Sequence, residues 1–150
     1  MALRIKSHWN NEEAERSLPE IASALAYIAW RIATDKAINL HCERFLYRDD
    51  TQRLAVIGEY LLFLIQIADR LAADRIEAED RRALVTALAR KLIEHVQDNS
   101  QDLLGPGDYG SPFIERLNVR SGEYAEFQLA ADGPSYAFLR HLGFEIQSLM

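Results

Sequence analysis

The sequence is poor in several features that identify large classes of protein. Its 150 residues include one cysteine, Cys42, which cannot form a disulfide within the chain and so excludes a disulfide-bonded extracellular miniprotein. We therefore expect a reducing compartment, and the cytoplasm is the simplest one. Residues 1–9 carry positive charge but no apolar run after it, so we expect no secretory signal.

Long hydrophobic runs are also missing. The longest uncharged stretches, Ile21–Trp30 and Tyr60–Ala68, are about half as long as a membrane-spanning helix. We expect both stretches to be buried parts of helices, and we expect no transmembrane segment.

Positive charge is scarce relative to negative charge. Lysines and arginines number 17 against 23 aspartates and glutamates, which gives a formal net charge of −6. Nucleic-acid binding needs a basic face, and acidic residues interleave with the densest basic cluster, which is Arg81, Arg82, Arg90 and Lys91. We therefore expect no nucleic-acid partner.

What the sequence has in abundance is apolar residues at helical spacing. Apolar residues make up 49% of the chain, and they recur every three or four residues, which predicts amphipathic helices. The first predicted helix begins at Asn10 or Asn11, and Pro19–Tyr47 is predicted as one bent helix or as two. A further helix covers Gln52–Ala73. The next begins around residues 77–80, carries apolar residues on one face as far as Val96, and has a polar end over residues 98–104. After the turn-forming segment Gly105–Pro112, shorter helices are predicted over Phe113–Leu117, from Ser121 to Leu129, and from Asp132–Pro134 to Leu149.

These elements predict an all-α protein. We expect residues 1–150 to form a single domain, an irregular antiparallel bundle of about five to six helices with a glycine-rich loop between two of them. The helix over Gln52–Ala73 is apolar on two sides and is predicted to be central. In the first long helix, the stripe expected to face the core is Leu18, Ile21, Leu25, Ile28 and Ile32.

Motifs typical of catalysis or cofactor binding are missing from the sequence. Gly105, Gly107 and Gly110 spell G-x-G-x-x-G, but no buried strand precedes them, so they are interpreted as an interhelical turn. No histidine follows a glutamate at the i, i+3 spacing that carboxylate-bridged metal centres use in helical bundles. His41 and Cys42 are neighbours on a helix and point about 100° apart, so they do not predict a catalytic pair. We expect no metal and no cofactor.

One line of polar residues stands out on the central helix. Glu59, Gln66 and Asp69 share a face of an otherwise apolar element. They form either a narrow solvent-facing stripe or a polar seam in a pocket. In the second case Glu59, Asp69 and His41 are acid or base candidates for an enzyme or a small-molecule-binding protein.

From Asp98 onward the chain resembles the ubiquinol-cytochrome c chaperone family. Members of that family carry an acidic helix end, a Gly-x-Gly-Asp turn, a proline and a later aromatic residue. The matching positions over Leu54–Phe127 are Asp98, Gly105, Gly107, Asp108, Pro112 and Tyr124. The chain departs from the family after the proline, where Phe113-Ile114-Glu115 stands in place of basic residues. The resemblance implies an all-helical fold and a role in assembling a respiratory complex.

The leading hypothesis is a non-enzymatic protein-interaction module. It rests on the missing catalytic motifs and on an abundance of aromatic rings, which either fill the core or form part of a partner or homodimer surface. The predicted partner-binding residues are Gly105, Gly107, Asp108, Tyr109, Pro112, Phe113 and Tyr124. We expect a protein partner, and a homodimer is compatible with this hypothesis.

Overall fold

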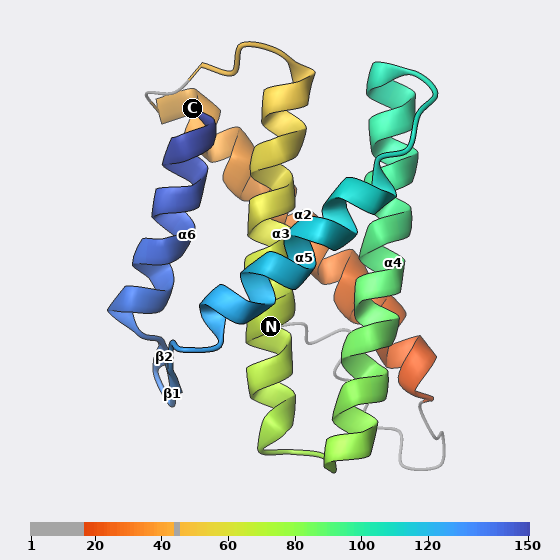
Figure 1. The fold of residues 1–150 in the computed structure, drawn as a ribbon, viewed down its shortest axis with the longest axis vertical. Helices are drawn as coiled ribbons and strands as arrows, with labels where there is room; N and C mark the ends of the chain where they lie inside the picture. The colour runs from red at the N-terminus through yellow and green to blue at the C-terminus, as the bar shows by residue number, and fades with distance from the viewer. Residues whose placement is uncertain (1–16, 44–45) are drawn as a thin grey trace.

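The computed structural model describes residues 17–43 and 46–150, and only the backbone of residues 41–43 (Figure 1). Five helices lie in these ranges and confirm the predicted all-α bundle. They are α2 (Leu18–Glu43), α3 (Asp50–Ala73), α4 (Ala78–Leu104), α5 (Gly110–Tyr124) and α6 (Tyr136–Leu149). The helix start predicted at Asn10 or Asn11 lies outside the described residues.

Helix α2 is one continuous element, so the structure shows one helix rather than two over residues 18–43 of the predicted Pro19–Tyr47 segment. Its start is fixed by a capping box. The Glu20 amide donates to the Ser17 hydroxyl at 3.3 Å, and the Ser17 amide donates to the Glu20 carboxylate at 3.2 Å. Pro19 lies in the first turn, where its missing N–H would have no intrahelical partner.

The buried face of α2 is not the predicted one. Among its described side chains, over residues 18–40, the buried ones are all alanines, at positions 22, 26, 29, 33 and 37. The expected stripe only flanks them, since Leu18, Ile21 and Leu25 are half-buried and Ile32 is exposed. Alanine spacing of three and four residues lets the α2 backbone approach α3 and α4 closely, so the larger side chains lie to the side.

Helix α3 is central, as predicted. It packs against all four other described helices, and Val56, Leu61, Leu62 and Ile65 are almost fully buried. Asp49 caps its N-terminus by accepting a hydrogen bond from the Gln52 amide at 2.9 Å. The helix begins at Asp50, two residues before the predicted start at Gln52.

The helices form layers around the α3–α4 hairpin. Helices α3 and α4 run antiparallel, and α6 lies beside α3 and antiparallel to it (Figure 1). Helix α2 crosses the hairpin diagonally on one face, and α5 crosses it diagonally on the other. A diagonal helix covers only part of a face, so each face of the hairpin keeps an open groove.

The C-terminal third differs most from the sequence prediction. The two short helices predicted after Pro112 are one helix, α5, which begins at Gly110 rather than after Ser111. The start predicted at Asp132–Pro134 is wrong by a few residues, because Gly133–Pro134 forms β2 and pairs with β1 (Leu129–Ala130) in a two-residue hairpin. Ser135 then caps α6 by accepting from the Phe138 amide.

Candidate functional site

The larger groove lies on the α5 side of the hairpin, where α3, α4 and α5 surround about 830 Å³. Its floor is apolar and includes Ile65, Val85, Ala89 and Ile93. Its polar lining is mostly basic and amide-bearing, with Gln66, Asp69, Arg70, Arg81, Arg82, Arg90, Asn118 and Ser121. We call this space the front groove. An apolar floor with a polar rim is typical of a binding site for an amphipathic ligand.

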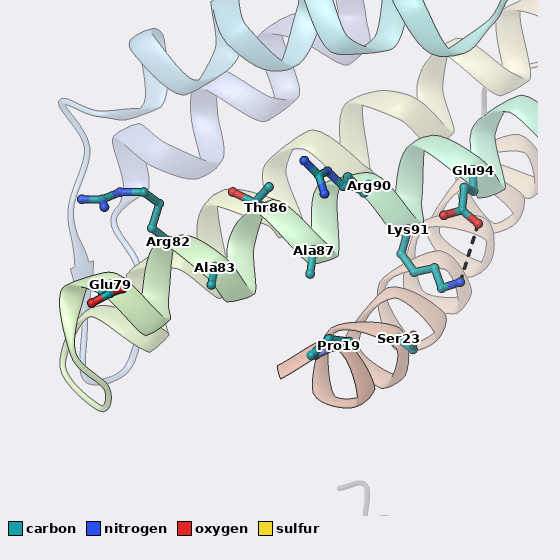
Figure 2. A pocket seen from close by; sticks show the side chains of 10 residues that line it. All are labelled: Pro19, Ser23, Glu79, Arg82, Ala83, Thr86, Ala87, Arg90, Lys91 and Glu94. Carbon is teal, nitrogen blue, oxygen red and sulfur yellow. Dashed lines mark ion pairs between the residues drawn. The ribbon is translucent and has the colours of Figure 1, made fainter. Parts of the chain in front are cut away.

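Two arginines dominate the rim of the front groove. Arg82 and Arg90 are exposed, and neither forms an ion pair with any residue in the described ranges. Figure 2 shows both guanidinium groups along α4, with Thr86 between them, and these three residues also line a neighbouring pocket together with Pro19 and Ser23 of α2. Arg81 is different, because it makes a bidentate ion pair with Asp69 at 2.7 and 3.0 Å. Arg82 and Arg90 are therefore positive groups at the rim without an ion-pair partner in the described ranges.

The opposite face of the hairpin carries a second groove of about 450 Å³, between α2, α3 and α4. Its lining is apolar apart from Arg75 and includes Leu25, Ile32, Leu64 and Leu71. Several residues of the predicted α2 core stripe lie here. We call this space the back groove.

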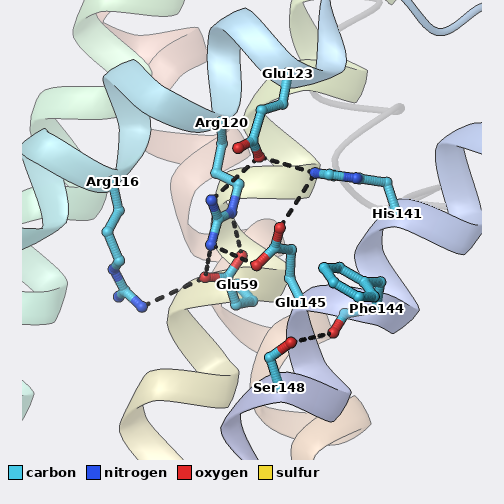
Figure 3. A network of polar contacts seen from close by, with 8 residues as sticks. All are labelled: Glu59, Arg116, Arg120, Glu123, His141, Phe144, Glu145 and Ser148. Carbon is cyan, nitrogen blue, oxygen red and sulfur yellow. Dashed lines mark hydrogen bonds and ion pairs between the residues drawn. The ribbon is translucent and has the colours of Figure 1, made fainter.

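A buried charge network joins α3 to α5 and α6 (Figure 3). Glu59, only 1% exposed, accepts hydrogen bonds from Arg120 Nε at 2.9 Å and from Arg120 Nη2 at 3.0 Å. Arg116 lies 3.5 Å from the same carboxylate. Arg120 also donates to Glu123 and Glu145. One guanidinium thus connects three carboxylates, and these pairings raise the pKa of Arg120.

Gly58 makes room for this network. A Cβ atom at position 58 would lie 2.5 Å from Nη2 of Arg116, so only glycine lets this guanidinium lie against α3 undisturbed. Burial lowers the pKa of Arg116, and Glu59 partly offsets that effect.

The polar line of α3 is therefore a seam between helices. The interpretation of Glu59, Gln66 and Asp69 as a solvent-facing stripe is wrong for Glu59 and Gln66, which are buried. Gln66 donates to the Ser121 hydroxyl of α5 at 2.9 Å. The alternative, a polar seam beside a pocket, describes Gln66 and Asp69, which line the front groove.

Arg70 extends the seam beyond the residues that the sequence singled out. It donates to the carbonyl oxygen of Tyr124 at 2.6 Å and to that of Phe127. The Tyr124 carbonyl group is the last of α5, where a cation is favourable, and Phe127 lies three residues beyond it. Only the return of the chain onto α3 reveals this role, since Arg70 and Tyr124 are 54 positions apart.

The two carboxylates predicted as acid or base candidates are each paired with an arginine. Asp69 is held by Arg81 and Glu59 by Arg120, so neither carboxylate presents an unpaired oxygen to the front groove. The side chain of His41 lies outside the described residues. The geometry thus favours a binding role for the front groove over general acid or base chemistry.

The predicted partner-binding residues divide into two groups. Phe113 and Tyr124 are 1% and 0% exposed, so their side chains lie in the core and not on a surface. The other five, Gly105, Gly107, Asp108, Tyr109 and Pro112, lie outside the core. Tyr109 donates its hydroxyl to the Gly105 carbonyl oxygen at 2.7 Å and so closes the loop on itself.

Gln97 of α4 holds that loop in place through side-chain hydrogen bonds. Its amide donates to Gly107 O at 2.7 Å, and its oxygen accepts from the amides of Tyr109 and Gly110. Gly105, at φ 95°, ends α4 in a conformation that favours glycine. The loop is therefore an ordered corner that sets the direction of α5, and its contact with a partner stays a prediction.

The aromatic residues are divided between core and surface. Phe63, Tyr124 and Phe138 pack as a cluster, with ring centroids 5.1 to 5.9 Å apart. Tyr27, Tyr136 and Phe144 are exposed. Part of the aromatic content thus fills the core, as one of the two alternatives predicted.

Comparisons with known proteins return no relative. No family model, no curated protein and no solved structure matches the chain. Among the described residues, no helix combines the length and the hydropathy needed to cross a bilayer.

Proposed function

We propose that the chain is a helical protein-interaction module that binds an amphipathic helix with acidic residues in the front groove. The observation that carries this proposal is the pairing of an apolar floor with two exposed arginines that have no ion-pair partner in the described part of the chain. The proposal makes the hypothesis of an interaction module more specific and moves the contact surface from the loop to the groove.

The shape of the front groove supports a helical ligand. Arg82, Thr86 and Arg90 follow one another every four residues along α4, so the rim extends over about 12 Å, or roughly two helical turns. A partner helix placed beside them has apolar side chains at i, i+3 and i+4 for the floor and acidic side chains for the rim. Ile114 of α5, which is exposed, adds apolar surface at the other edge.

The charge of the chain makes the rim selective. The protein carries a net charge of −6, so an acidic ligand is repelled by most of its surface and attracted by Arg82 and Arg90. A basic ligand would be attracted elsewhere but repelled at the groove. Charge complementarity at the rim therefore fixes the type of ligand and its orientation.

The assembly role implied by the resemblance to the ubiquinol-cytochrome c chaperone family is a narrower form of this proposal. An assembly factor holds an apolar segment of a subunit until that segment finds its final partner. A groove with an apolar floor suits that task, but it would equally suit the binding of other partner proteins.

The test uses two designed peptides with the same leucine face and with either glutamates or lysines on the polar face. We expect the full chain to bind the acidic peptide at least tenfold more tightly, measured by fluorescence anisotropy at low and at physiological salt. The double variant Arg82→Glu with Arg90→Glu should reverse that preference. Thr86→Trp, which adds bulk at an exposed rim position, should weaken binding of both peptides.

The matched control is Arg31→Glu with Arg140→Glu, which changes the net charge equally at exposed positions on α2 and α6. This control should keep the preference for the acidic peptide. The proposal fails if the control loses the preference as the rim variant does, or if Thr86→Trp leaves both affinities unchanged. A light-scattering mass of two copies that falls to one copy in Thr86→Trp would instead assign the groove to a homodimer.

A further inference from the structure

The outer end of the charge network brings together three side chains that can ligate a metal ion. Glu123 of α5 and His141 and Glu145 of α6 each place a donor atom within 4.8 Å of the other two. The His141 Nε2 atom lies 2.8 Å from Glu123 Oε1 and 3.4 Å from Glu145 Oε2 (Figure 3). We propose that these three residues bind one divalent transition-metal ion, with Zn²⁺ as the probe.

The spacing of the donor atoms fits such an ion. In a tetrahedral zinc site with bonds of about 2.0–2.2 Å, ligand atoms lie roughly 3.4 Å from one another. The distance from His141 Nε2 to Glu145 Oε2 already has this value, and the donor atoms of all three residues lie within 4.8 Å of one another. One nitrogen and two carboxylate oxygens leave a fourth position open.

Arg120 orients the carboxylates of Glu123 and Glu145 by donating a hydrogen bond to each. Its Nη2 atom donates to Glu145 Oε1 at 2.9 Å, which leaves Oε2 of the same carboxylate facing His141. Its Nη1 atom donates to Glu123 Oε1 at 3.1 Å, and Glu59 holds the guanidinium in place. Hydrogen bonds to ligating carboxylates fix them for the metal, as outer-shell groups do in metal sites.

A second observation at this site is the hydroxyl group of Tyr124. It is buried and has no hydrogen-bond partner among the residues described here. The Tyr124 ring contacts His141 edge-on, with centroids 5.1 Å apart. An ion or its bound water would supply the partner that a buried hydroxyl needs.

The charge and the exposure of the cluster also suit a cation. Three carboxylates face two guanidinium groups, so the carboxylates outnumber the cationic side chains that pair with them. The side chains of Glu123, His141 and Glu145 are 37%, 21% and 14% exposed, so an ion can reach them from solvent. The site is separate from the front groove, and neither proposal depends on the other.

The test is equilibrium dialysis of the metal-free full chain against Zn²⁺, with all proteins carrying Cys42→Ser so that a thiol site does not contribute. We expect one tightly bound equivalent in the parent. His141→Ala and Glu123→Gln should each weaken its affinity at least tenfold. Because Glu123 is the most exposed ligand, Glu123→Gln keeps the test informative if His141→Ala fails to fold.

The matched controls are His95→Ala on α4 and Glu126→Gln just after α5. Both controls should retain the tight equivalent, and Co²⁺ should give a d–d absorption band that depends on His141. The proposal is overturned if His141→Ala binds Zn²⁺ as tightly as the parent, or if the parent binds none at millimolar zinc. Displacement of Zn²⁺ by an equal concentration of Ca²⁺ would also overturn it, because that result describes unspecific carboxylate binding.

Discussion

Helix α3 meets its neighbours through two opposite kinds of interface. On the α2 side, a row of buried alanines lets the helix backbones approach closely. On the α5 and α6 side, Glu59, Gln66 and Arg70 of α3 form hydrogen bonds with residues more than 50 positions away. The first interface depends on small side chains and close packing. The second depends on satisfying every buried charge, because an unpaired charge is far more costly than a small cavity.

The largest effect is expected for Glu59→Ala, which tests the polar interface of α3 with α5 and α6. This change leaves Arg120 buried without its main partner, so we expect a loss of about 3–5 kcal/mol in the free energy of unfolding. Urea denaturation measures it. Glu123→Ala, at the exposed end of the same network, is the control and should cost much less. Equal losses in the two variants would show that the buried pair contributes no more than the exposed one.

The alanine interface is tested by adding volume rather than removing charge. Ala33→Leu inserts three carbons where the α2 backbone lies close to its neighbours, and we expect a loss of about 1–3 kcal/mol. Ile32→Leu, at the exposed neighbouring position, should be almost neutral in the same denaturation experiment. An Ala33→Leu variant as stable as the parent would mean that α2 has room to move away.

Two tyrosine hydroxyl groups show how much a hydrogen-bond partner contributes to stability. Tyr124→Phe removes a buried hydroxyl without a partner in the described residues, and we expect a gain of about 1 kcal/mol in chelator-treated protein. Tyr47→Phe removes a hydroxyl that donates to the Ala37 carbonyl oxygen at 2.8 Å, and should cost about 1 kcal/mol. Thermal unfolding of both variants distinguishes them, and a loss in Tyr124→Phe would indicate a partner for its hydroxyl.

The smallest effect is expected at an exposed carboxylate. Hydrogen bonds from the Ser111 hydroxyl and amide lower the pKa of Asp108 at the start of α5. A lowered folded-state pKa means that the ionised group stabilises the fold above its unfolded pKa, and that this contribution is lost as the pH falls through the folded value. Asp108→Ala should therefore be less stable than the parent at pH 7 and equally stable in strong acid. Denaturant unfolding of both proteins at neutral and at strongly acidic pH measures this difference.

Prediction from the sequence was successful where helical periodicity carried the information. The central position of α3 followed from its two apolar sides, and the break at Gly105 followed from its glycine and proline residues. Prediction was wrong for the core face of α2, because large apolar residues dominate a periodicity argument whereas alanine allows the closest packing. It was also wrong for the length of α5, since Ser121 and Gly122 resemble a helix boundary but lie within the helix.

The candidate sites were harder to predict from the sequence than the helices were. Glu59, Gln66 and Asp69 were recognised as unusual, but their partners Arg120, Ser121 and Arg81 lie 61, 55 and 12 positions away. Glu123, His141 and Glu145 gave no signal beyond the i, i+4 spacing of the last two. The third member comes from another helix, and only packing places it beside them.

The sequence by itself determined that the chain is helical, where most of its helices lie and that α3 is central, because these properties depend on local propensity and on apolar spacing. The tertiary structure alone decided that α2 and α5 cross the hairpin diagonally, that Arg82 and Arg90 rim an open groove, and that Glu59 is buried beneath Arg120. The physical reason is that grooves and ion networks depend on crossing angles and on side chains far apart in the chain, which the pattern along one helix does not contain.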